Sequence, residues 1–232
     1  MFVKICGTTN EEDALLAVAM GADAVGFVFA PSPRQVSVTT ASDIAKRLPR
    51  EVLTVGVFRD EAPSRVVDLV QRAGLGAAQL HGHETPEQAQ WVHSRVPVVF
   101  QAFCAGDRAV ERAREYGVDA ILIDAPTPGS GQVFDWSMAE APAGTRLILA
   151  GGLDATNVGQ AIARVHPWGV DVASGVEASP GRKDPVKVRA FVAAARAAAD
   201  DPPPAEPDEA DEADEAEVAG EGGLYDWEWE GA

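Results

Sequence analysis

The chain has 232 residues and carries 36 Asp and Glu against 19 Lys and Arg, a formal net charge of −17. Residues 201–232 hold 13 of the acidic residues and no Lys or Arg, so residues 1–200 have a net charge of −4. No basic run is present, which disfavours nucleic-acid partners because these bind through phosphate neutralisation.

The two cysteines, Cys6 and Cys104, have no paired spacing, which excludes a disulfide framework and clustered-cysteine metal sites. No stretch approaches the roughly 20 apolar residues that cross a bilayer, and the N-terminus lacks a signal-peptide layout. We therefore expect a cytoplasmic protein with no membrane partner.

Short apolar runs rich in β-branched residues predict eight strands, which begin near residues 2, 23, 52, 77, 98, 119, 146 and 169. Helical periodicity between them predicts helices over residues 11–20, 63–73, 86–94, 108–116 and 156–165. Strands that alternate with helices pair in parallel, since only a crossover can return the chain to the same edge. Eight such units in 1–200 predict a single (β/α)8 TIM barrel. The competing open doubly wound sheet lacks its Gly-x-Gly-x-x-Gly sequence after the first strand.

Residues 201–232 differ from the barrel in composition. A run of prolines precedes acidic residues interspersed with Ala, and this stretch does not bury enough apolar area to offset the entropy of ordering. The sequence therefore predicts a disordered acidic C-terminal tail. Residues 224–230 place two tryptophans among acids, and the tail is read either as a solvating segment or as a docking motif for a protein partner.

Five side chains near predicted strand ends are candidates for chemistry, because the active site of an α/β barrel lies where strands end. Asp124 follows three apolar residues, where an acid is costly unless it is hydrogen-bonded or functional. Cys6 and Cys104 hold similar positions, and residue type alone favours inert buried cysteines. Arg34 is either a bidentate carboxylate ligand or a solvated arginine. His81 is either a proton carrier or a hydrogen-bonded structural residue.

The ends of the seventh and eighth strands predict a phosphate site. Gly151-Gly152 and Ser174-Gly175 let backbone N–H groups approach an anion closely. A helix N-terminus capped by Asp154 or Thr156 would add its dipole. These strands are also where such barrels often bind phosphate.

No His, Asp or Glu cluster has metal-ligand spacing, so we expect no metal. A thiol and a carboxyl without a cofactor motif suit proton transfer, such as isomerisation of a phosphorylated sugar. Lys4 shares the inward face of its strand with Cys6, which leaves a Schiff-base lysine open.

Residues 1 to about 198 resemble the phosphoribosylanthranilate isomerase family, whose members use a (β/α)8 barrel without a cofactor to make tryptophan precursors. The resemblance rests on VKICGTT (3–9), GFVF (26–29), SPRQVS (32–37), VGVF (55–58), QLHG (79–82), FDW (134–136), AGGL (150–153), GVDVASGVE (169–177) and PGRKD (180–184). The strand-six loop (GSGQ, 129–132) departs from the family pattern, and the acidic tail lies outside it.

This resemblance implies the Amadori rearrangement of N-(5′-phosphoribosyl)anthranilate to the 1-deoxyribulose phosphate. Asp124 would protonate the ring oxygen, and Cys6 would take the proton from ribose C2′. Arg34 would hold the anthranilate carboxylate and His81 would line the pocket, with phosphate bound at the Gly151-Gly152 and Ser174-Gly175 ends. A free thiol has a pKa of about 8.5 and a free Asp about 3.9. The site must therefore favour thiolate and protonated carboxyl, and we expect local positive potential at the thiol.

Two alternatives stay open. A related phosphosugar barrel, the aminoimidazole ribotide isomerase of histidine synthesis, usually has an acid on its first strand, where this chain has Cys6. A barrel without turnover could instead act as a binding protein through its acidic tail. The pairing of Cys6 with Asp124 argues against the second alternative.

Overall fold

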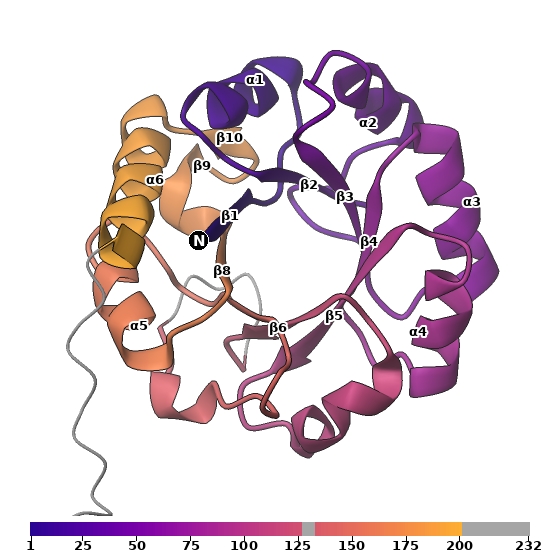
Figure 1. Cartoon of the computed structure of the whole chain (residues 1–232). Coiled ribbons are helices and arrows are strands. Elements are labelled where there is room, and N and C mark those ends of the chain that lie inside the picture. Colours follow the sequence, from indigo (N-terminus) through magenta and orange to yellow (C-terminus); the bar gives the residue numbers. More distant parts are fainter. Residues whose placement is uncertain (127–132, 201–232) are drawn as a thin grey trace, which may run out of the picture. The chain divides into compact units, whose positions relative to one another are not determined.

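The structure, a computed structural model, describes residues 1–126 and 133–200. The predicted acidic tail and the strand-six loop at 129–132 lie outside the described residues. Eight parallel strands form a closed barrel in chain order, with β1 paired to β8 (Figure 1). The strands are β1 (Phe2–Ile5), β2 (Ala24–Val28), β3 (Leu53–Phe58), β4 (Ala77–Leu80), β5 (Val98–Cys104), β6 (Ala120–Asp124), β7 (Leu147–Leu149) and β8 (Gly169–Val172).

Helices surround the barrel, as Figure 1 shows. They are α1 (Glu11–Ala19), α2 (Val38–Ala45), α3 (Pro63–Ala73), α4 (Pro86–His93), α5 (Val158–Val165) and α6 (Pro185–Asp200), with the 3₁₀ segments η1 (Arg108–Tyr116), η2 (Trp136–Met138) and η3 (Ser174–Val176). A short antiparallel hairpin, β9 (Glu177–Ser179) and β10 (Arg182–Lys183), follows β8. Within residues 1–126 and 133–200, no helix is long and apolar enough to cross a membrane.

The predicted (β/α)8 barrel is confirmed, and each strand begins within one residue of its predicted start. The predicted helix at 108–116 is present with the predicted bounds, as the 3₁₀ helix η1. Its first turn is held by the side chain of Asp107, which accepts from the N–H of Ala109, and Gly117 ends it at φ 61°. The predicted repeat of eight units therefore holds, although the unit after β5 carries the tighter helix.

The apolar core has two layers. The larger layer packs the inner faces of the helices against the outside of the barrel, and it includes Phe191 of α6, which is fully buried. The second layer fills the interior of the barrel, where small and large side chains alternate. Its members are Ala24, Val55, Ala77, Phe100, Ala102, Ala120, Leu122, Ile148 and Ala150.

Helix α6 connects the end of the described chain to its beginning. The guanidinium of Arg196 donates to the carbonyl of Gly21 at 2.9 Å and to the carboxylate of Asp23 at 2.8 Å, and it also contacts the carbonyl of Met1. The Asp23 carboxylate in turn accepts from the N–H of Val3 at 2.7 Å. These contacts hold α6 over the seam at which the barrel closes.

Shortening Phe191 should destabilise the barrel through loss of buried area and a residual cavity. We expect Phe191→Ala to lower the free energy of unfolding by about 3–5 kcal/mol. Urea unfolding followed by circular dichroism measures this change. Val186→Ala on the same helix is the matched control, because Val186 is 76% exposed and its change should stay within about 0.5 kcal/mol. Equal losses for the two variants would contradict the proposed packing of α6.

Candidate active site

A cavity of about 420 Å³ opens at the carboxyl ends of the strands. It brings together four of the predicted residues, Cys6, Arg34, His81 and Asp124, which are far apart in the sequence. Its other lining residues are Gly7, Val28, Ala30, Pro31, Ser32, Pro33, Val57, Arg59, Gln79, Asp171, Ala173 and Pro180. The cavity is thus lined by groups that can transfer protons and bind anions.

Cys6 follows β1 and lies beside two charged side chains of the barrel interior. Lys4, on the same face of β1, is fully buried, and its Nζ lies 2.9 Å from Oδ1 of Asp171. Lys4 and Asp171 are directly paired in the β1–β8 register. A Cβ added at Gly26 on β2 would lie 2.8 Å from Sγ of Cys6 and 3.3 Å from Nζ of Lys4. The glycine therefore leaves the space that the thiol occupies.

The pKa of the Cys6 thiol is raised, whereas a favoured thiolate was expected. Burial raises the pKa of the Cys6 thiol above its ordinary value, and the nearby ammonium of Lys4 opposes this rise. Burial also disfavours the Lys4 ammonium, but Asp171 and Cys6 outweigh it and raise the pKa of Lys4. The expected positive charge is therefore present beside the thiol.

Asp124 ends β6 and faces the same cavity. It is buried, with 8% of its surface exposed, and its Oδ1 accepts from the N–H of Ala125 at 2.8 Å. Its Oδ2 lies 3.4 Å from Nε2 of His81. Nδ1 of His81 is 3.2 Å from the amide nitrogen of Gln79. A histidine ring nitrogen therefore faces one carboxyl oxygen of Asp124.

Arg34 is not free in this structure. Its Nε and Nη2 donate to the two carboxylate oxygens of Glu177 at 2.8 Å each. The hydrogen bond to Glu177 raises the pKa of the guanidinium. Burial disfavours the Glu177 carboxylate, but Arg34 and Lys183 outweigh that effect and lower its pKa. With two of its five N–H donors engaged, Arg34 keeps both N–H groups of Nη1 and the second N–H of Nη2 for a ligand.

Lys183 ties the hairpin to the site. Its buried Nζ donates to the carbonyl of Cys6 at 2.6 Å, to the carbonyl of Ala173 at 3.1 Å and to Glu177 at 3.1 Å. Burial lowers the pKa of Lys183, and Glu177 opposes this effect. The hairpin thus fixes the backbone at the ends of both β1 and β8.

The predicted phosphate residues lie at one side of the cavity. A smaller space of about 50 Å³ adjoins it, and the two share Asp124, Asp171 and Ala173 among their lining residues. Gly151, Gly152 and Ser174 line the smaller space. The two glycines have φ of 85° and 67°, which favours residues without a Cβ and points their backbone into this space. Gly175 lies within η3 beside this space but does not line it.

The helix cap near this space differs from the predicted one. Helix α5 begins at Val158 with Asn157 at its N-cap, rather than Asp154 or Thr156. Asp154 instead accepts from the backbone N–H groups of Thr156 at 2.7 Å and Asn157 at 3.2 Å. Asn157 accepts in turn from the N–H of Asp154 at 2.9 Å, so a reciprocal turn precedes the helix.

Cys104 does not line either of these spaces. It ends β5 beside Asp124 in the β5–β6 register, and it is half-buried. Burial and the Asp124 carboxylate raise its pKa, which makes it a weaker candidate for a thiolate. A position at a strand end therefore does not show which cysteine is the better candidate. The neighbouring side chains do, because Cys6 lies beside the Lys4 ammonium and Cys104 beside the Asp124 carboxyl.

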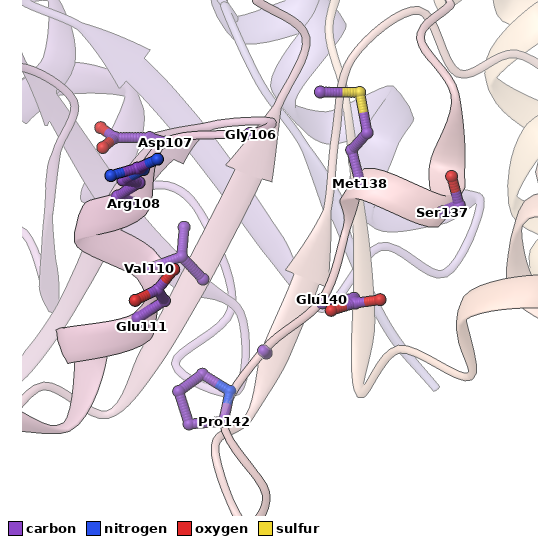
Figure 2. A pocket seen from close by; sticks show the side chains of 10 residues that line it. Gly106, Asp107, Arg108, Val110, Glu111, Ser137, Met138, Glu140 and Pro142 are labelled. Atoms are coloured by element: carbon purple, nitrogen blue, oxygen red, sulfur yellow. The ribbon is translucent and has the colours of Figure 1, made fainter.

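A second hollow of about 470 Å³ lies beyond the end of β5. Figure 2 shows Asp107, Arg108 and Glu111 on one wall and Met138 and Glu140 on the other. None of the predicted site residues lines it. Its carboxylates, Asp107, Glu111 and Glu140, are exposed, whereas Cys6 and Asp124 of the first cavity are buried.

Several polar residues of the site were not predicted. Asp171, Glu177 and Lys183 lie within the family motifs GVDVASGVE and PGRKD, and none of them was predicted to act in the site. Asp171 on β8 had a signal, because an acid with inward parity in an apolar strand is costly without a partner. No sequence feature identified Glu177 and Lys183 of the hairpin, because the contact between their side chains depends on tertiary folding. Among residues 1–126 and 133–200, no group of three or more His, Cys, Asp or Glu is arranged to hold a metal ion.

Comparison with known proteins decides the family. The sequence model described as "N-(5'phosphoribosyl)anthranilate (PRA) isomerase" matches residues 3–194. The chain belongs to this family. It is 49% identical over 201 residues to the N-(5'-phosphoribosyl)anthranilate isomerase of Desulforudis audaxviator, covering 84% of this chain and 98% of the relative. It is 46% identical to that of Thermotoga maritima, covering 82% of this chain and 96% of the relative.

Solved structures agree with this assignment. The phosphoribosyl anthranilate isomerase of Thermus thermophilus superposes with a TM-score of 0.80 at 42% identity, covering 85% of this chain and 99% of its own. A family structure in complex with reduced 1-(o-carboxyphenylamino)-1-deoxyribulose 5-phosphate gives a TM-score of 0.75 at 41% identity, with the same coverage. The part of this chain outside these matches includes the acidic tail.

The packing of Gly26 against the thiol yields a prediction. Gly26→Ala places a methyl group 2.8 Å from Sγ of Cys6, which must displace the thiol or Lys4. We expect kcat to fall by about 10-fold or more, because small displacements of a catalytic group are costly. Steady-state turnover of freshly prepared phosphoribosylanthranilate measures this loss.

Gly159→Ala is the control for this substitution. Gly159 lies in α5, where an added Cβ meets only Ala198 at 4.0 Å. Its replacement should leave turnover unchanged and stabilise the helix slightly. Wild-type turnover in the Gly26 variant would show that the thiol does not need this space.

Proposed function

We infer that this chain catalyses the Amadori rearrangement of N-(5′-phosphoribosyl)anthranilate to 1-(2-carboxyphenylamino)-1-deoxyribulose 5-phosphate in tryptophan biosynthesis. One observation carries the mechanism. A buried thiol and a buried carboxyl, Cys6 and Asp124, come from separate strands and line one cavity. Family membership supplies the substrate, and the cavity offers one side chain for each of the two proton transfers.

Asp124 is the proposed general acid. Its proton goes to the furanose ring oxygen, the bond from this oxygen to C1′ breaks, and a Schiff base forms between C1′ and the anthranilate nitrogen. The carboxylate that remains is held by the backbone N–H of Ala125 and faces Nε2 of His81. His81 is thus placed to stabilise the charge that develops on the acid.

Cys6 is the proposed general base. Its thiolate takes the proton from C2′, and the electron pair of that C–H bond forms the C1′–C2′ double bond while the nitrogen becomes neutral. The enolamine then tautomerises to the ketone. No electrons leave the substrate, so acid–base groups are sufficient for the reaction.

Two charged ends of the substrate would anchor it across the cavity. Nη1 of Arg34 is the proposed donor to the anthranilate carboxylate, and the glycine-lined space beside Ser174 is the proposed phosphate site. A relative binds reduced 1-(o-carboxyphenylamino)-1-deoxyribulose 5-phosphate, a compound with the same two ends. The cytoplasmic location and a protein partner for residues 201–232 stay predictions.

Removing either proton-transfer group should abolish most turnover. We expect Cys6→Ala and Asp124→Asn each to reduce kcat by about 10²–10⁴-fold, the range for loss of a general acid or base. Fluorescence of the anthranilate group during conversion measures the rate. Cys104→Ala is the matched control and should retain activity, because Cys104 does not line the cavity. A fully active Cys6→Ala variant would contradict the assignment of the base.

Replacing Arg34 by lysine should weaken mainly substrate binding. Arg34→Lys loses the bidentate contact with Glu177 and the planar group that faces the carboxylate. We expect KM to rise by about 10-fold or more while kcat changes less, because Arg34 is proposed to bind the carboxylate and not to transfer a proton. A large loss in kcat at unchanged KM would instead place Arg34 in the chemical step.

A further inference from the structure

The buried ammonium of Lys4 is not used by the two proton transfers described above. It lies inside the barrel with no exposed surface, and burying a charge in an apolar interior is costly. A salt bridge with Asp171 compensates part of this cost. A neutral pair would satisfy the packing equally well, so the presence of the charge calls for a reason.

Geometry places this charge beside the thiol. Lys4 and Cys6 are separated by one residue on the same strand and face the same side. Sγ of Cys6 and Nζ of Lys4 border the same space above Gly26, which limits their separation to about 6 Å. At this range an opposite charge shifts a titration by about one to three pH units.

We propose that Lys4 is a positioning residue whose ammonium stabilises the thiolate of Cys6, while the carboxylate of Asp171 pairs with this ammonium and offsets part of its charge. For its catalytic consequence, this inference rests on the proposed function. Lys4 lies beside the base and does not line the cavity, so its effect on turnover passes through Cys6. It is therefore not expected to form a Schiff base.

The other charged groups around Cys6 do not replace Lys4. Lys183 from β10 is bonded to the carbonyl oxygen of Cys6 and to Glu177, so its charge is largely neutralised. Arg34 is held by both oxygens of Glu177. Asp171 from β8 is an acid that disfavours a thiolate. Lys4 is thus the principal group among the described residues that favours the charged thiol.

The experiment titrates the thiol in the full-length protein. Thiolate absorbance in the ultraviolet is measured against pH for each variant, and the curve of the corresponding Cys6→Ser protein is subtracted. Lys4→Met should raise the midpoint by about one to three pH units. Lys4→Arg, which keeps a cation, should stay near the wild-type midpoint.

A second substitution should shift the titration midpoint of Cys6 in the opposite direction. Asp171→Asn removes the acid that offsets Lys4, so the midpoint of Cys6 should fall. If the ion pair had only a structural role, both variants would be less stable, and the titration midpoint of Cys6 would not shift in opposite directions. Lys187→Met is the matched control, because Lys187 is exposed, donates to the carbonyl of Glu177 and should leave the midpoint unchanged.

Circular dichroism establishes whether Lys4→Met folds with Asp171 left unpaired. Should it fail to fold, Lys4→Met with Asp171→Asn removes both charges and should still raise the midpoint, since Lys4 acts more strongly on the thiol. An unchanged or lowered midpoint in the folded variant overturns the proposal. Absence of isomerase turnover in the wild type would refute the proposed function, while the titration would still decide the role of Lys4.

Discussion

The pairing of β1 with β8 is the interaction on which the rest of the structure depends. It closes the barrel in a four-residue register from Phe2 against Gly169 to Ile5 against Val172. Lys4 and Asp171 occupy one pair of this register and form an ion pair across the seam inside the barrel. The next inward position on β1 is Cys6. Closure of the fold and placement of the proposed base are therefore one structural event.

Charges around the site are arranged as compensated groups. Lys4 pairs with Asp171, and Glu177 is shared by Arg34 and Lys183. Each group keeps a charge below the surface without leaving it unpaired, which a buried ion requires. The hairpin that supplies Glu177 and Lys183 also bonds the carbonyls of Cys6 and Ala173. The proposed carboxylate-binding arginine and the proposed base are consequently held by the same hairpin.

Much of the fold could be predicted from periodicity, because eight apolar runs alternate with helical segments and admit few topologies. The predicted helix at 108–116 is a 3₁₀ helix, a type that its apolar spacing does not distinguish from an α-helix. The site was predicted in part. Asp124 followed from the cost of an acid in an apolar strand. Family motifs were needed to choose Cys6 over Cys104.

What escaped prediction was the pairing of charges. The contact of Arg34 with Glu177 spans 143 residues, and that of Lys4 with Asp171 spans 167. Nothing in local sequence encodes such contacts, because barrel closure and the fold of the hairpin create them. The arginine was expected to be available to a carboxylate, but the structure shows that one protein carboxylate already holds two of its nitrogens.

The central claim is that Cys6 and Asp124 perform successive proton transfers in one rearrangement. Turnover of phosphoribosylanthranilate by wild type, Cys6→Ala, Asp124→Asn and the double variant tests it most directly. Groups that serve steps in series give non-additive losses. We predict that the double variant is about as slow as the slower single variant. Losses that multiply, or a wild-type protein that forms no ketose product, would contradict the account.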